Sequence, residues 1–164
     1  MISMWRNRRT RSKIKREGVA IMARQASENL RSHIKRCESF SKKAYRCPAG
    51  VLTCGWGHTK GVTKATTCDE ATAERWLTDD LAPAVAFCNG IRQLNTQGRF
   101  DAIVDFAFNA GIGNLKKSTL LRLIRGGASD KAICTELRKW VYANGRKLDG
   151  LVKRREWEAA QWVK

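Results

Sequence analysis

Hydrophobic residues recur at helical spacing through most of this chain. The first such segment follows Ser27, a residue type that favours the N-cap position of a helix. Its apolar positions, Leu30, Ile34 and Cys37, stand three to four residues apart and so share one helical face. The pattern predicts a helix that begins after Ser27 and ends at Glu38.

A second helix is predicted from Thr67 onward. Residues 67–70 have the form of a capping box, with Thr67 at the N-cap and Glu70 three residues later. The apolar face that follows contains Trp76, Leu77 and Leu81. Pro83 stands inside this pattern and is a candidate for a kink.

The central core element is predicted next. Phe100, Ile103, Val104 and Ala107 define one face of a strongly apolar helix, and Gly111 is suited to its C-terminal cap. A shorter helix is predicted over residues 118–124, and the glycines at 126 and 127 end it.

Two helices are predicted for the C-terminal part. The first begins after Ser129 and continues past Trp140 and Val141 to Gly145, and Asp149 then caps a last helix. The apolar residues of the last helix are Leu151, Trp157 and Trp162.

One stretch, residues 38–59, predicts β structure. Pro48 and Gly50 fit the second and fourth positions of a type I turn that starts at Cys47, and the glycines at 55 and 57 permit close backbone approach. With no other convincing β region, the sequence predicts an α+β protein, mostly helical, with one small early sheet.

Charge restricts the possible partners. The 164 residues include 32 Lys and Arg against 15 Asp and Glu, a formal net charge of +17. Such an excess raises affinity for polyanions such as nucleic acid, anionic lipid or anionic cell-wall polymer. Residues 1–16 contain seven cations and no acid, so residues 1–22 are predicted to form a disordered basic arm before a single domain at 23–164. No apolar run has the length of a membrane span or a signal peptide, and a cytoplasmic protein is expected.

Cysteine spacing argues against a metal centre. The six cysteines contain no C-x-x-C pair, and the chain has only two histidines, so neither a zinc site nor a cofactor is expected. Thiols made in a reducing compartment are expected to stay reduced, and several to act as small core residues. Oxidation among Cys37, Cys47 and Cys54 is a separate hypothesis for a switch that would lock the site.

Four motifs stand in order along the chain: Glu38 to Thr59, Phe100 to Gly111, Ser118 to Leu121 and Gly150 to Glu156. Together they resemble the phage-type lysozymes of glycoside hydrolase family 24, especially the soluble endolysins of tailed phages. The resemblance covers about residues 27–162. It implies a small β-containing lobe at about 38–66 and a helical lobe at about 67–164 around a cleft. It also implies hydrolysis of the β-1,4 bond between N-acetylmuramic acid and N-acetylglucosamine in peptidoglycan.

The resemblance also implies roles for individual residues. Glu38 becomes the candidate general acid, which must hold its proton near neutral pH. The family usually has an Asp nine residues later and a Thr fifteen residues later, where this chain has Cys47 and Thr53. Thr53 could orient the attacking water. Cys47 either polarises that water, which we favour, or attacks the anomeric carbon as a thiolate.

Other side chains are assigned by the same resemblance. His58 is expected to be structural and paired with Asp80. Asn109 and Trp140 are candidates to line the saccharide cleft, with a plain core role equally open for Trp140. Arg154 is the candidate to reach Glu38 or the substrate, and its neighbour at position 155 is the alternative.

Partners follow from the same resemblance. A monomer is expected in the host cytoplasm, with a holin to give it access to the wall and the basic arm to contact anionic surfaces. Three alternatives stay open: a lytic transglycosylase, a cationic membrane- or polyanion-binding protein with impaired catalysis, and a nucleic-acid-binding protein. The last lacks a recognition-helix or aromatic RNA-binding signature.

Overall fold

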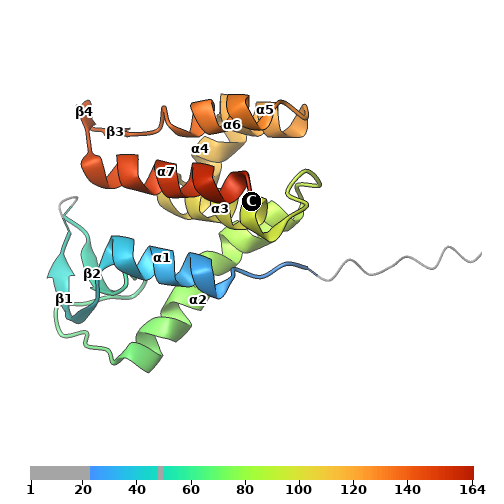
Figure 1. The fold of residues 1–164 in the computed structure, drawn as a ribbon. Coiled ribbons are helices and arrows are strands. Elements are labelled where there is room, and N and C mark those ends of the chain that lie inside the picture. Colours follow the sequence, from blue (N-terminus) through green and yellow to red (C-terminus); the bar gives the residue numbers. More distant parts are fainter. Residues whose placement is uncertain (1–22, 48–49) are drawn as a thin grey trace, which may run out of the picture.

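A computed structural model describes residues 23–47 and 50–164 (Figure 1). The predicted basic arm and Pro48 of the predicted turn lie outside the described residues. The helices are α1 Glu28–Glu38, α2 Glu70–Asn89, α3 Gln97–Ala110, α4 Ile112–Lys117, α5 Thr119–Arg125, α6 Asp130–Leu137 and α7 Asp149–Trp162. The strands are β1 Ser41–Arg46, β2 Leu52–Gly55, β3 Tyr142–Ala143 and β4 Arg146–Lys147. The predicted α+β class, mostly helical with a small early sheet, is confirmed.

Helix α1 begins and ends as predicted, but the start of α2 is different. The Ser27 hydroxyl accepts from the backbone N–H of Leu30, as an N-cap does. For α2 the predicted cap at Thr67 is wrong, because Asp69 has the extended backbone and its side chain accepts from the N–H of Thr72 at 2.8 Å. Thr67 instead pairs with Lys43, so it belongs to the edge of the first hairpin. Helix α2 runs without a break past its internal proline.

The C-terminal part departs most from prediction. Helix α6 ends at Leu137, well before Gly145, and the chain forms a second antiparallel hairpin, β3–β4. Asn144 and Gly145 connect its strands with positive φ angles of 49° and 74°, which Asn-Gly pairs adopt readily in tight hairpins. Asp149 is the first residue of α7 and makes no cap, because Leu148 has the N-cap position. The short helix α4 was not predicted either.

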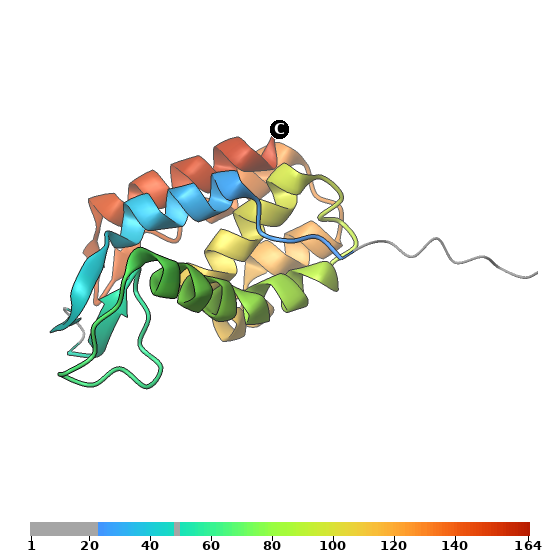
Figure 2. The ribbon, with the colours of Figure 1, turned by 90° about the horizontal axis from the view of Figure 1, so that it is seen from below.

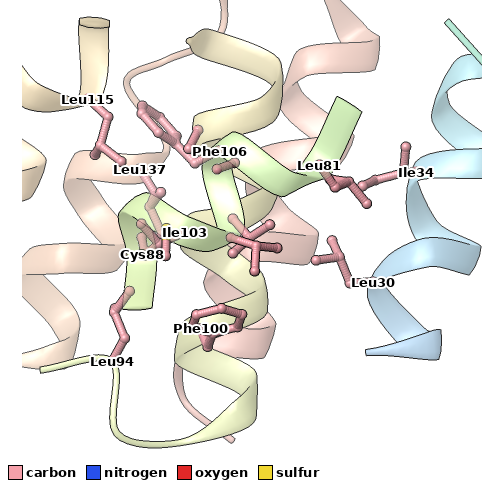
Figure 3. Close-up of a cluster of buried hydrophobic side chains, with 14 of the residues drawn as sticks. Leu30, Ile34, Leu81, Cys88, Leu94, Phe100, Ile103, Phe106, Leu115 and Leu137 are labelled. Atoms are coloured by element: carbon pink, nitrogen blue, oxygen red, sulfur yellow. The ribbon is translucent and has the colours of Figure 1, made fainter. Parts of the chain in front are cut away.

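Helix α3 is the centre of the core. Every residue from Phe100 to Ala107 is buried, and α3 packs against both α2 and α7. Figure 3 shows side chains from several helices meeting at this helix. Those labelled are Leu30, Ile34, Leu81, Cys88, Leu94, Phe100, Ile103, Phe106, Leu115 and Leu137. A helix buried on all sides offers a rigid base for any polar group it carries.

Helices α1 and α7 lie side by side and run in opposite directions, in both views (Figures 1 and 2). His33 of α1 stacks on Trp157 of α7, with ring centroids 3.8 Å apart. The β1–β2 hairpin lies beyond the C-terminal end of α1. Helix α2 begins on the side of the molecule where this hairpin lies and runs toward the other helices. The end of α1 is therefore the junction between the first hairpin and the helical part.

Candidate active site

Glu38 lies at this junction. The next residue, Ser39, has a φ of 57°, which turns the chain out of α1 and into β1. The Glu38 side chain is 29% exposed, and its Oε1 accepts from Arg154 Nη1 at 2.9 Å. On its other side is Gly57, where a Cβ atom would lie only 3.2 Å from Glu38 Oε2. The carboxylate is thus held between α7 and the loop after β2.

Arg154 is itself held by a buried carboxylate. Its Nε and Nη2 donate to the two oxygens of Asp105 on α3, at 2.9 and 2.8 Å. Burial alone would raise the pKa of Asp105, but the charge and hydrogen bonds of Arg154 keep that pKa below its ordinary value. Burial acts against the Arg154 cation, yet Asp105 and Glu38 hold the pKa of Arg154 above its ordinary value. Arg154 is therefore a fixed cation that presents one N–H to Glu38.

His33 packs beside this ion pair. Its Nε2 lies 3.7 Å from Asp105 Oδ2 and 3.5 Å from Cys37 Sγ. Burial lowers the pKa of His33 to about 4, against the pull of the Asp105 charge, so the ring is neutral at pH 7. Sequence reasoning missed Asp105 and His33. The available signal was an acid in the middle of the most apolar helical face, which needs a buried partner.

The β1–β2 hairpin carries Cys47 and Thr53. The Cys47 backbone bonds to Val51 and Gly50 across the turn, at 3.0 and 2.7 Å. Thr53 pairs with Tyr45 in the strand register, is buried, and donates its hydroxyl to the Val51 carbonyl at 3.1 Å. These contacts hold the backbone of Cys47 and the side chain of Thr53 against the turn.

Tyr45 reports on the charges around the hairpin. Burial raises the pKa of its phenol, and the charges of Glu38 and Cys47 raise it further. Both groups are therefore within electrostatic range of the same phenol.

His58 and Asp80 form the contact that the resemblance implied. His58 Nδ1 lies 2.8 Å from Asp80 Oδ2, and its Nε2 donates to the Lys60 carbonyl at 2.9 Å. The ring stacks on Trp76, with centroids 4.5 Å apart. The contact joins the loop after β2 to α2, which suits a structural role.

Asn109 and Trp140 line a second region, near the β3–β4 hairpin. They border a pocket of about 300 Å³ together with Tyr142 and Arg155. Trp140 also packs edge-on against Phe106, at 5.0 Å between centroids, as its predicted core role requires, and its role in the saccharide cleft stays a prediction. Arg155 instead donates to Asn109 and Glu158. Of the two neighbouring arginines, Arg154 is the one at Glu38.

The buried cysteines lie apart from this chemistry. Cys54 and Cys68 place their sulfur atoms 3.4 Å apart in the core of the first hairpin. Burial raises the pKa of Cys68 to about 11 and that of Cys88 to about 12, so these thiols are poor nucleophiles. Residues 23–47 and 50–164 contain no group of three or more His, Cys, Asp or Glu side chains suited to a metal ion. No helix in this part of the chain is long and apolar enough to cross a membrane.

Comparison with known proteins identifies the family of this chain. Residues 35–158 match the family described as phage lysozyme. The chain belongs to the phage lysozyme family. It is 37% identical to a SAR-endolysin of Bacteriophage PS119 over 129 residues, which cover 74% of this chain and 73% of the relative. An endolysin of Bacillus phage B103 is 39% identical over 138 residues, 82% of this chain, but the match spans only about half (51%) of that endolysin.

A solved structure agrees with the fold. The muramidase domain of SpmX from Asticaccaulis excentricus superimposes with a TM-score of 0.78 at 28% identity, covering 85% of this chain and 98% of that domain. Within the phage lysozyme family this chain has a thiol, Cys47, at the position where the resemblance leads us to expect an aspartate. The roles of individual site residues therefore have to be argued from the structure.

Proposed function

We propose that this protein is an endolysin of the muramidase type, a glycoside hydrolase that cleaves the β-1,4 bond between N-acetylmuramic acid and N-acetylglucosamine in peptidoglycan. The observation that carries the proposal is the placement of Glu38 between Arg154 and Gly57, in a chain of this family. Glu38 is the general acid that protonates the glycosidic oxygen. Once it has given up its proton, Arg154 Nη1 stabilises the carboxylate that remains.

Thr53 is suited to position the attacking water. Its hydroxyl hydrogen is donated to the Val51 carbonyl, so its oxygen can accept a hydrogen bond from water. A water that donates to Thr53 keeps a lone pair for the anomeric carbon. Cys47, in the adjacent turn, polarises the same water in our preferred scheme.

Product stereochemistry tests the role of Cys47. Water attack on the face opposite the acid inverts the anomeric configuration, whereas attack by the Cys47 thiolate followed by hydrolysis retains it. Nuclear magnetic resonance of freshly released products separates the two. A Cys47→Asp variant as active as the parent supports water activation, and an inert one indicates chemistry that needs sulfur.

The decisive test of function compares the wild type with Glu38→Gln on purified peptidoglycan. We expect the variant to retain its fold by circular dichroism and to lose at least about a thousandfold in the release of reducing ends. Mass spectrometry of the muropeptides distinguishes hydrolysis from transglycosylase chemistry, because an anhydro product lacks the added water. Full activity in Glu38→Gln would end the proposal.

We also propose that the protein waits in the host cytoplasm as a monomer and reaches the wall after a holin has permeabilised the membrane. The alternative is lysis that needs no holin. Induction in a bacterial host with and without a co-expressed holin tests this: lysis that depends on the holin supports it, and rapid lysis without one contradicts it.

The net charge of +17 supports a second candidate, a cationic protein that disrupts anionic membranes. Removal of residues 1–21 would then abolish lysis, while Glu38→Gln would not. The two variants, assayed side by side on whole cells, separate the candidates.

A further inference from the structure

Arg155 follows Arg154 on α7 but donates hydrogen bonds to a different pair of side chains. Its side chain is 1% exposed and lies over the Phe106 ring, 4.9 Å from the centroid. Its Nη2 donates to Glu158 Oε1 at 2.7 Å and to Asn109 Oδ1 at 2.8 Å. Glu158 is completely buried, so the two α7 side chains hold each other.

This contact decides which way the Asn109 amide points. A guanidinium has only hydrogen-bond donors, so the atom of Asn109 that faces Arg155 must be its carbonyl oxygen. The amide NH₂ is then directed away from Arg155. Asn109 is exposed and borders the pocket of about 300 Å³ with Trp140 and Tyr142. Without Arg155 the amide could present either end to that pocket.

Two adjacent arginines of α7 connect this pocket with Glu38. Asp105 and Asn109 are four residues apart on α3, so they share a helical face about one turn, or 6 Å, apart. Arg154 bonds to both Asp105 and Glu38. Arg155 bonds to Asn109, one turn further along α3, at the edge of the pocket. A substrate bound at Glu38 therefore has its neighbouring groups within reach of Asn109.

We propose that Arg155 is a positioning residue that fixes Asn109 as a hydrogen-bond donor to an amide carbonyl oxygen of the substrate. The proposal rests on the muramidase function above. Such a carbonyl occurs in two places on peptidoglycan, the N-acetyl groups of the sugars and the stem peptide. Trp140 and Tyr142 supply an apolar wall beside it.

Asn109→Asp separates a donor role from a structural one. An aspartate oxygen can accept from Arg155 as the amide oxygen does, so the fold is retained, but the second oxygen is an acceptor where the substrate needs a donor. On soluble glycan strands that carry stem peptides, we expect KM to rise about tenfold, with kcat within about twofold and an unchanged or higher Tm.

Asn95→Asp is the matched control. Asn95 is exposed, and its Oδ1 also accepts from an arginine, Arg99, at 3.4 Å, but it does not border this pocket. We expect it to keep the wild-type KM. If Asn109→Asp has the same KM as Asn95→Asp, the proposal is wrong.

Arg155 is tested together with Glu158, because removing Glu158 alone leaves the buried Arg155 cation unpaired, and removing Arg155 alone leaves the buried Glu158 carboxyl without its donor. Arg155→Met with Glu158→Met should raise KM about threefold, since the Asn109 amide is then free to turn. Should this double variant not fold, Arg155→Lys gives the same readout, because a single ammonium cannot hold both partners in a fixed fork. A wild-type KM in the variant that folds contradicts the positioning role.

The carbonyl is located by repeating the assay on strands stripped of stem peptides by an amidase. A KM difference between wild type and Asn109→Asp that vanishes on stripped strands assigns the stem peptide, and one that persists assigns the N-acetyl group. The muramidase function is controlled separately. If the wild type releases no more reducing ends than Glu38→Gln, the muramidase assignment has failed. If the wild type is active and Asn109→Asp leaves KM unchanged, only this inference is refuted.

Discussion

The interface between α3 and α7 holds its site residues by buried ion pairs, whereas the β1–β2 hairpin holds its own by backbone hydrogen bonds. At the interface, Arg154 spans from Asp105 to Glu38 and is 4% exposed. In the hairpin, the backbone of Cys47 bonds across the turn, and the Thr53 hydroxyl donates to the Val51 carbonyl. A substitution at the interface should therefore cost stability and activity together, while one in the hairpin should cost activity alone.

Arg154→Met tests the interface with the largest expected effect. It leaves the Asp105 carboxylate buried without its partner, which should cost about 3 to 5 kcal/mol and lower Tm by about 10 °C. Arg138→Met on the surface is the control, because the Arg138–Glu156 pair is about half exposed and should be worth less than about 1 kcal/mol. Urea and thermal unfolding measure both, and equal losses would contradict the contrast.

Cys47→Ala tests the hairpin. We expect about a hundredfold loss of activity on peptidoglycan with Tm within a few degrees of the wild type. Cys134→Ala is the opposite case: Cys134 is buried against α7, so its truncation should lower Tm and leave the rate of the folded protein unchanged. Unfolding of Cys47→Ala would show that the thiol is a packing residue.

His33 makes the interface sensitive to acid. Because its folded pKa, about 4, lies below the unfolded value of 6.5, the unfolded chain binds more protons between these pH values. This contribution to stability is complete above pH 6.5 and is lost as the pH falls from 6.5 to about 4. We expect His33→Phe, which can still stack on Trp157, to reduce the loss between pH 7 and pH 4 by about 2 kcal/mol in urea titrations. An unchanged pH dependence would exclude His33 as its source.

Gly57→Ala probes the point where the two regions meet. A Cβ atom there would lie 3.2 Å from Glu38 Oε2, and φ is +87°, so we expect about a tenfold loss of activity together with about 1 kcal/mol of strain. Gly61 has a similar φ, +72°, but a Cβ atom there would have no other atom within 4 Å, so Gly61→Ala is the control. It should show the strain without the loss of activity. Equal activity in the two variants would remove Gly57 from the wall of the site.

Oxidation of the hairpin core is the smallest expected effect. Prolonged treatment with oxidised glutathione at alkaline pH should convert the Cys54 and Cys68 thiols to a disulfide, with glutathione disulfide reduced to two thiols, since the sulfur atoms lie 3.4 Å apart. Alkaline pH is needed because burial raises the pKa of Cys68 to about 11. The bond closes a loop between residues 54 and 68, and Tm should rise by about 5 °C. Peptide mapping identifies the pair, and Cys54→Ala is the control. Mapping that instead joins Cys37 to Cys47 would favour the hypothesis of a lock on the site.

Local signals were sufficient where one residue type dictates the backbone. Ser27 caps α1 and Gly111 caps α3 because their side chain or φ angle satisfies the helix end within a few residues. The same locality explains the misses. The Asn144–Gly145 hairpin has a strong local signal, but Trp140 and Val141 also continue the apolar pattern of the helix before them. Trp140 instead packs on Phe106 from outside that helix.

The sequence by itself determined the helical pattern, the early hairpin, and the candidate acid, thiol and hydroxyl at Glu38, Cys47 and Thr53. Only the tertiary structure decided which arginine reaches Glu38 and that Asp105 holds this arginine. Arg154 is 116 residues from Glu38 and 49 residues from Asp105 along the chain. Pairings over such distances depend on how α1, α3 and α7 pack, and the periodicity of each helix contains no information about its neighbour's register. A buried charge without a partner is costly, so a packing that pairs Arg154 with Asp105 is favoured over one that leaves either alone.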